Sequence, residues 1–164
     1  MNIFEYAMQM EKDGESFYRE LAGKCRIEGI RTILNMLASE EVKHYNTIAL
    51  LEKHAENFLP AKTKILDDVK NIFIKMKEDT VEICFDSSGL EAYKKALIIE
   101  EMSRKFYLDK AAEVGHENEK QIFLRLAAEE DYHKRILENV VEFVARPEPG
   151  SWLENAEWHH LDEY

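Results

Sequence analysis

The sequence is poor in residues that interrupt regular structure and poor in cysteine. Six glycines and three prolines occur in 164 residues, so long uninterrupted elements are expected. The two cysteines, Cys25 and Cys84, stand far apart and form no C-x-x-C pair. This argues against a disulfide framework and against a zinc or iron–sulfur site built on cysteine.

An excess of positive charge and long apolar runs are missing too. The formal net charge is −11, which argues against nucleic acid or an anionic membrane as the main partner. No run is long and apolar enough to span a bilayer, and the N-terminal segment acquires charge too early for a secretory signal. We therefore expect a cytoplasmic protein, with part of its negative charge offset by bound cations.

The sequence does contain strong helical periodicity. Apolar residues recur at helical spacing in four long segments. These segments cover about residues 2–26, 30–57, 90–114 and 117–145, and Ser87 or Ser88 is expected to cap the third. Short turns at Gly29 and Gly115 would make the first helix antiparallel to the second, and the third antiparallel to the fourth.

A long connection, residues 58–89, separates the two hairpins and contains a short helical segment, LDDVKNIFIKMKED. Such a connection lets the chain cross the bundle from end to end. The sequence therefore predicts an all-α, ferritin-like four-helix bundle over residues 1–146, two helical hairpins joined by a long crossover. Residues 147–164 form an acidic tail with two tryptophans, expected to dock on the bundle, on a partner protein or on a second subunit.

The two hairpins repeat each other at an offset of 89 residues. LASEEVKH (37–44) recurs as LAAEEDYH (126–133), and EKDGESFY (11–18) aligns with EEMSRKFY (100–107). Four glutamates, two histidines and two tyrosines are matched, as the pairs Glu11/Glu100, Tyr18/Tyr107, Glu41/Glu130 and His44/His133. The repeat therefore gives both hairpins the same set of side chains that can bind metal or take part in catalysis.

The matched charged residues lie on the apolar stripes of their helices. Each helix points one glutamate inward, and two helices add a histidine one turn later, at i+3. Unpaired burial of each ion would cost on the order of several kcal/mol, whereas two divalent cations would neutralise the carboxylates and use both imidazoles. Iron or manganese suits these ligands, and zinc is compatible. The predicted metal ligands are Glu11, Glu41, His44, Glu100, Glu130 and His133.

An alternative interpretation is that these side chains face solvent and that the repeat only records a duplication. That interpretation explains the offset of 89 residues but not the charge on four apolar stripes. Glu40 and Glu129 each precede a predicted ligand by one position, about 100° around the helix. We expect those two carboxylates to be solvated.

With these motifs the sequence resembles the rubrerythrin branch of the ferritin-like superfamily. The resemblance covers residues 2–145 and rests on the four matched pairs above. It implies that the same six side chains bind metal, with Glu41 and Glu130 bridging the two ions. It also implies that Tyr18 and Tyr107 take part in catalysis by steadying the ligands, while their alternative role is that of ordinary core tyrosines.

The sequence departs from that family in two ways. Rubrerythrins typically append a rubredoxin domain with paired C-x-x-C motifs, which this sequence lacks, so electrons would come from a separate donor. Ser103 stands where rubrerythrins commonly carry a further glutamate, three residues after the third-helix ligand. The redox-linked movement of iron known in the family is therefore not an expectation here.

The resemblance implies a di-iron oxidoreductase that reduces hydrogen peroxide, or dioxygen, with electrons from an external donor protein. Two alternatives stay open: an iron-binding or ferroxidase protein, and a non-enzymatic interaction module in which the metals act as structural ties. Other di-metal chemistry, including manganese catalase activity, is a further alternative. Because helical bundles of this kind often pair, a homodimer is also expected.

Overall fold

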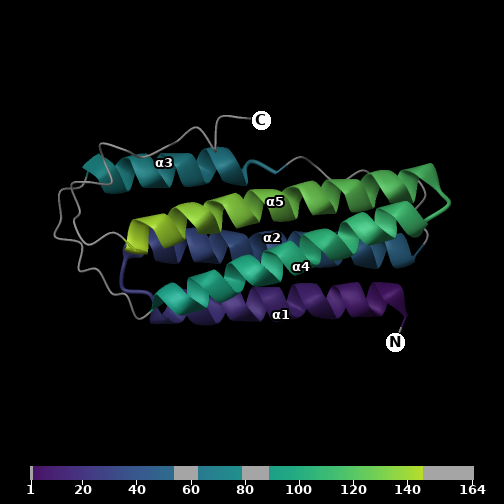
Figure 1. Cartoon of the computed structure of the whole chain (residues 1–164), viewed down its shortest axis with the longest axis horizontal. Helices are drawn as coiled ribbons and strands as arrows, with labels where there is room; N and C mark the ends of the chain where they lie inside the picture. Colours follow the sequence, from purple (N-terminus) through teal and green to yellow (C-terminus); the bar gives the residue numbers. More distant parts are fainter. Residues whose placement is uncertain (1, 54–62, 79–88, 146–164) are drawn as a thin grey trace.

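The computed structural model describes residues 2–53, 63–78 and 89–145, which form an all-α, ferritin-like bundle. The helices of these ranges are α1 (Ile3–Lys24), α2 (Glu28–Glu52), α3 (Ile65–Glu78), α4 (Leu90–Glu113) and α5 (Glu117–Ala145). The four long helices lie side by side, and α3 lies along one flank of the bundle (Figure 1). The predicted fold class is confirmed, and the tail at 147–164 lies outside the described residues.

The first hairpin is closed by a three-residue link between α1 and α2. Helix α1 begins with a capping box, in which Asn2 Oδ1 accepts from Glu5 N and Glu5 Oε2 accepts from Asn2 N, both at 2.8 Å. Cys25 and Ile27, the first and last residues of the link, both have extended backbone conformations. The prediction that Gly29 marks this turn is therefore wrong, because Gly29 lies inside the first turn of α2.

The second hairpin turns at the predicted glycine. Helix α4 ends at Glu113, and the chain passes through Val114, Gly115 and His116 before α5 begins. At its other end α4 is preceded by Gly89, which occupies the N-cap position without a side-chain hydrogen bond. The predicted cap at Ser87 or Ser88 lies outside the described residues.

The short helix predicted within the long connection is α3. Its residues Ile65 and Val69 are buried against the bundle. This packing explains why the connection contains an amphipathic helical segment. As Figure 1 shows, α3 runs back along the bundle, so that α2 and α4 start at the same end. This is the long crossover that the sequence predicts.

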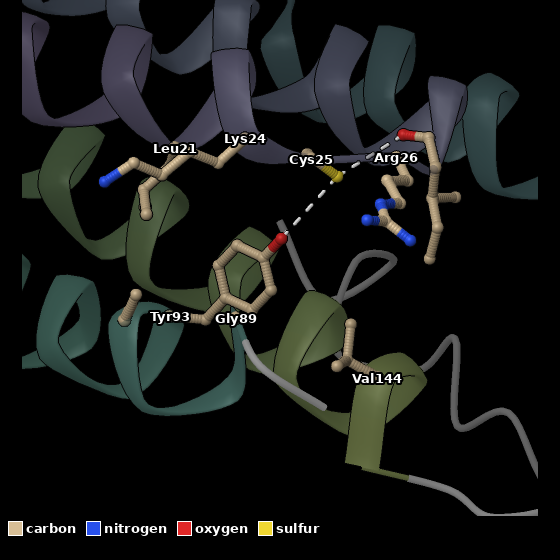
Figure 2. Close-up of a pocket in the computed structure, with 9 residues that line it drawn as sticks. Leu21, Lys24, Cys25, Arg26, Gly89, Tyr93 and Val144 are labelled. Atoms are coloured by element: carbon tan, nitrogen blue, oxygen red, sulfur yellow. Dashed lines mark hydrogen bonds between the residues drawn. The ribbon is translucent and has the colours of Figure 1, made fainter. Parts of the chain in front are cut away.

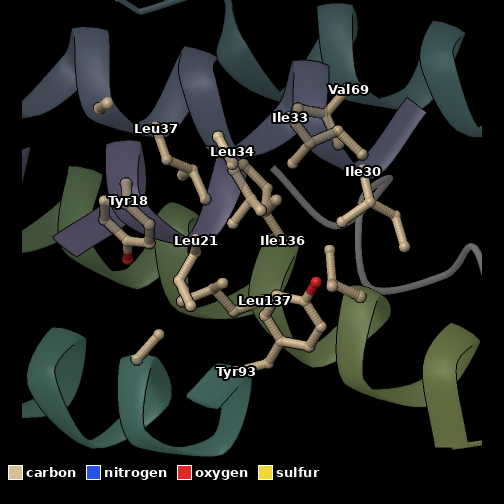
Figure 3. Packing of buried hydrophobic residues seen from close by; sticks show 14 of the residues in the cluster. Tyr18, Leu21, Ile30, Ile33, Leu34, Leu37, Val69, Tyr93, Ile136 and Leu137 are labelled. Carbon is tan, nitrogen blue, oxygen red and sulfur yellow. The ribbon is translucent and has the colours of Figure 1, made fainter. Parts of the chain in front are cut away.

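The apolar core is divided into two clusters by a layer of charged side chains. Toward one end Leu34 and Leu37 pack against Ile136 and Leu137 (Figure 3). Toward the other end a second cluster includes Ile48 and residues of α5 between 122 and 127. On each long helix the predicted ligands lie between the two clusters; we call these six side chains, Glu11, Glu41, His44, Glu100, Glu130 and His133, the charged layer.

A cavity of about 220 Å³ opens at the bundle end where α1 finishes and α4 begins. There the Tyr93 hydroxyl donates to Cys25 Sγ at 3.6 Å, and the side chain of Val144 lines the opposite wall (Figure 2). The cavity lies beside the apolar cluster of Figure 3 and contains none of the charged-layer residues. None of the helices in the described ranges is long and apolar enough to cross a membrane.

Candidate metal centre

All six predicted ligands point into the bundle interior. Their exposed fractions run from 0% for Glu130 and His133 to 5% for Glu41. Helices α1 and α4 each contribute one glutamate, and helices α2 and α5 each contribute a glutamate and a histidine. The alternative interpretation, in which these residues face solvent, is therefore wrong.

The ligand atoms form two overlapping groups of four. One group is Glu11, Glu41, His44 and Glu130, and the other is Glu41, Glu100, Glu130 and His133. Within each group the ligand atoms lie within 4.8 Å of one another, and Glu41 and Glu130 belong to both. Two cations bound side by side would therefore share those two carboxylates, as the resemblance implies for bridging ligands.

The histidine rings face the carboxylates through their Nδ1 atoms. His44 Nδ1 lies 3.1 Å from Glu130 Oε1 and 3.5 Å from Glu11 Oε2. His133 Nδ1 lies 3.1 Å from Glu41 Oε1 and 3.4 Å from Glu130 Oε2. The two rings are stacked, with centroids 5.3 Å apart and planes 12° apart. Both imidazoles thus direct the same nitrogen at the shared glutamates.

Several of these buried atoms lack a hydrogen-bond partner among the described residues. They are Glu11 Oε2, Glu41 Oε1, Glu130 Oε2, and both ring nitrogens of His133. A buried polar atom without a partner is costly, and native structures contain few. The unsatisfied oxygens and His133 Nδ1 are the atoms that face one another across the layer. Four carboxylates and two imidazoles with such atoms fit a pair of divalent cations.

Burial among like charges changes the protonation of two glutamates. Burial, and after it the charge on Glu130, raises the pKa of Glu100 to about 8. Burial also raises the pKa of Glu41 well above its usual value, and the charges on Glu130 and Glu11 add to the shift. Without a cation these two carboxyl groups keep their protons where an exposed glutamate ionises, so a bound cation must displace protons.

Glu130 behaves in the opposite way because it lies between the two rings. Burial alone would raise the pKa of Glu130, but the charge on His44 and the close contacts with both histidine rings outweigh burial and lower it. Burial lowers the pKa of each histidine, yet Glu130 beside His44 and Glu100 beside His133 outweigh it and raise both values. Without metal, Glu130 is thus a carboxylate held between two protonated rings.

The two predicted tyrosines donate to the glutamates of the opposite hairpin. Tyr18 on α1 donates to Glu100 Oε1 on α4, and Tyr107 on α4 donates to Glu11 Oε1 on α1. Burial, and after it the charge of the bonded glutamate, raises the pKa of both phenols. Both hydroxyls therefore stay protonated and act as donors, and the second oxygen of Glu11, Oε2, is left without a hydrogen-bond partner among the described residues. Their part in catalysis stays a prediction.

Two carboxylates next to the ligands were expected in solvent, and that prediction is wrong. Glu40 is 5% and Glu129 8% exposed. Glu129 Oε2 accepts from His44 Nε2 at 2.9 Å. Burial raises the pKa of Glu40, but hydrogen bonds from Lys43 and Thr63 outweigh burial and lower it. The offset of about 100° around the helix did not predict exposure, because a neighbouring helix or segment also covers that side. The sequence feature that could have indicated burial is the Glu-Glu pair, which occurs in both repeats.

Sequence reasoning also missed Gly14, one turn after Glu11. A Cβ atom at Gly14 would lie 3.1 Å from Glu41 Oε2, which is closer than an ordinary van der Waals contact. The absent side chain therefore makes room for the Glu41 carboxylate. Ser103, the corresponding residue of the second repeat, is also small and is 7% exposed.

A known protein family matches most of the chain. The family model described as Rubrerythrin matches residues 2–141, which include every residue of the charged layer. The comparisons with curated proteins and with solved structures give no match.

Proposed function

The chain belongs to the rubrerythrin family, and from that premise we propose that it is a di-iron oxidoreductase that reduces hydrogen peroxide with electrons from a separate donor protein. The observation that carries the proposal is the charged layer, in which two groups of four buried ligand atoms share Glu41 and Glu130. Dioxygen is the alternative oxidant. The metal could also be manganese or zinc, which the same ligands accept.

In this proposal one iron is held by Glu11, Glu41, His44 and Glu130, and the other by Glu41, Glu100, Glu130 and His133. When bound, two ferrous ions would supply the two electrons that, with two protons taken up from solvent, reduce hydrogen peroxide to two molecules of water. The protein supplies the positions of the ligands and the dry surroundings. The apolar clusters on both sides of the layer keep bulk water away from it.

The tyrosines have a defined task in this proposal. Tyr107 holds Glu11 through Oε1, so that Oε2 is the oxygen left to bind a cation, and Tyr18 holds Glu100 in the same way. Because their raised pKa values keep both phenols protonated, each hydroxyl can hold its glutamate in one orientation as the charge at the site changes.

Rapid mixing of the ferrous-loaded protein with each oxidant tests the proposal. Protein loaded without oxygen is mixed with hydrogen peroxide or with dioxygen, and oxidation is followed by absorbance. We expect oxidation by peroxide to be much faster than oxidation by dioxygen. Equal, slow rates would contradict peroxide reduction. A Glu130→Ala/His133→Ala variant controls for iron oxidised away from the site.

An iron-oxidising or iron-carrying role is the second candidate. The net charge of −11 favours it, because a strongly negative protein attracts cations. In the same experiment this candidate predicts that dioxygen oxidises the bound iron at least as fast as peroxide does, and that the oxidised iron leaves the site. A donor that re-reduces the iron for repeated cycles would argue for the oxidoreductase instead.

A further inference from the structure

The two repeats match in their ligands but not in what holds the ligand histidines. Each histidine belongs to a Glu-Glu-x-x-His segment, and the first glutamate of each pair is buried: Glu40 in α2 and Glu129 in α5. An offset of 89 residues relates the two. If the repeats were equivalent, each of these glutamates would contact the histidine of the other repeat.

Only Glu129 makes that contact. Glu129 Oε2 lies 2.9 Å from His44 Nε2, while Nδ1 of the same ring faces Glu130 and Glu11. A cation bound at Nδ1 would leave the ring proton on Nε2, and Nε2–H would then donate a hydrogen bond to the Glu129 carboxylate. Arg125 approaches the other oxygen of Glu129, with Nε 3.5 Å from Oε1. The His44 ring is thus fixed from both of its nitrogens.

Glu40 is engaged elsewhere. It accepts from Lys43 Nζ, one turn along α2, and from Thr63 Oγ1 at 2.8 Å, just before α3 begins. Nε2 of His133 is left without a hydrogen-bond partner among the described residues. The flanking residues account for the difference, because the repeat places Tyr132 where α2 has Lys43 and Met36 where α5 has Arg125.

We infer that Glu129 is a positioning residue for His44 and that the two cation positions are therefore unequal, the one at His44 being the tighter. The inference rests on the metal pair of the proposed function. A carboxylate that accepts from the outer nitrogen of a ligand imidazole fixes the ring and makes its inner nitrogen more basic; losing such a partner typically weakens metal affinity about 10–100-fold.

Titration with Co²⁺ against a chromophoric chelator tests the inference. We expect the wild-type protein to bind two Co²⁺ ions with separable affinities. Glu129→Ala should weaken the tighter one about 10–100-fold, and Glu129→Gln, which keeps an acceptor oxygen and loses the charge, should recover part of the loss. The matched variants Glu40→Ala and Glu40→Gln should leave both affinities within about threefold, well below that range.

The outcomes separate the two proposals. If the wild-type protein binds two Co²⁺ ions and Glu129→Ala binds them as tightly, Glu129 does not position His44 and only this inference fails. An equal loss in the Glu40 variants would also overturn it. If the wild-type protein binds no Co²⁺, the metal site itself fails and the inference with it. Should Glu129→Ala not fold, the isosteric Glu129→Gln carries the test, with circular dichroism confirming its fold.

Discussion

Glu41 and Glu130 differ from the other two glutamates of the charged layer because each lies within reach of both cation positions. Glu11 and Glu100 each belong to one position and accept a hydrogen bond from a tyrosine. This division of roles among chemically identical side chains follows from their places on the four helices. It predicts that substitutions at the shared and unshared ligands will have different effects.

Substitution of a shared ligand should lower the number of bound metal ions per chain more than substitution of an unshared ligand. We expect Glu130→Ala to lose both cations, because Glu130 belongs to both groups, and His133→Ala to lose one. Metal analysis after purification without oxygen and dialysis measures this. Glu101→Ala is the control, since Glu101 neighbours Glu100 on α4 but is exposed and pairs with Lys134. Full metal content in Glu130→Ala would refute the ligand assignment.

The tyrosine hydroxyls should contribute to stability as well as to orientation. Tyr107→Phe leaves Glu11 Oε1 buried without its donor, so we expect the free energy of unfolding of the metal-loaded protein to fall by about 1–3 kcal/mol. Tyr18→Phe should behave alike at Glu100. Tyr6→Phe, at a position 52% exposed, should change stability by less than about 0.5 kcal/mol. Chemical denaturation measures all three, and equal stability of Tyr107→Phe and Tyr6→Phe would contradict the prediction.

At the scale of the helices, the periodicity of apolar residues was enough to predict the long elements and their order. The element ends were less predictable. Gly29 was expected in a turn, but it lies inside α2, and Cys25 and Ile27 of the link have extended conformations that need no glycine. Burial of Glu40 and Glu129 depends on which neighbouring segment covers that side of the helix, and a single-helix projection does not contain that information.

Helix α1 also offers a test of close packing at the charged layer. Gly14→Ala places a Cβ atom 3.1 Å from Glu41 Oε2, so Glu41 must move and metal affinity should fall. Gly23→Ala is the matched control, because no atom lies within 4 Å of its added Cβ, and helix propensity makes it neutral or stabilising by up to about 1 kcal/mol. Metal titration of both variants measures the difference in affinity. Wild-type affinity in Gly14→Ala would show that the close approach has no role at the site.

At the scale of the whole molecule, two apolar clusters are assembled on either side of a layer of four buried glutamates and two buried histidines. The repeat predicted the six residues of the charged layer from sequence because the same residues recur on apolar stripes in both hairpins. Their convergence at one level depends on the three-residue link between α1 and α2 and on the route of the crossover. The contacts of Glu40 with Thr63 and of Glu129 with His44 follow from that assembly and could not be predicted from spacing.

The protonation of the layer predicts how the stability of the metal-free protein depends on pH. The pKa of Glu100 is raised from 4.5 to about 8, so between those values the folded state holds a proton that the unfolded state has lost. Stability therefore falls as pH rises through this window. The raised pKa values of His44 and His133 act in the same direction, because their contribution is lost as pH rises through the folded value.

Chemical denaturation in the presence of a chelator, at several pH values from 5 to 8, measures this dependence. Saturation with Mn²⁺ should remove it, since cations bind the deprotonated carboxylates and compete better as pH rises. Metal-free stability that stays constant or increases from pH 5 to 8 would contradict the assigned protonation.

The most direct test of the account is the anomalous diffraction of crystals of the protein loaded with ferrous iron without oxygen. The account predicts two anomalous peaks inside the bundle, both bound by Glu41 and Glu130, one beside His44 and the other beside His133. A map with no peak between these glutamates, or with iron bound only at surface carboxylates, would contradict it.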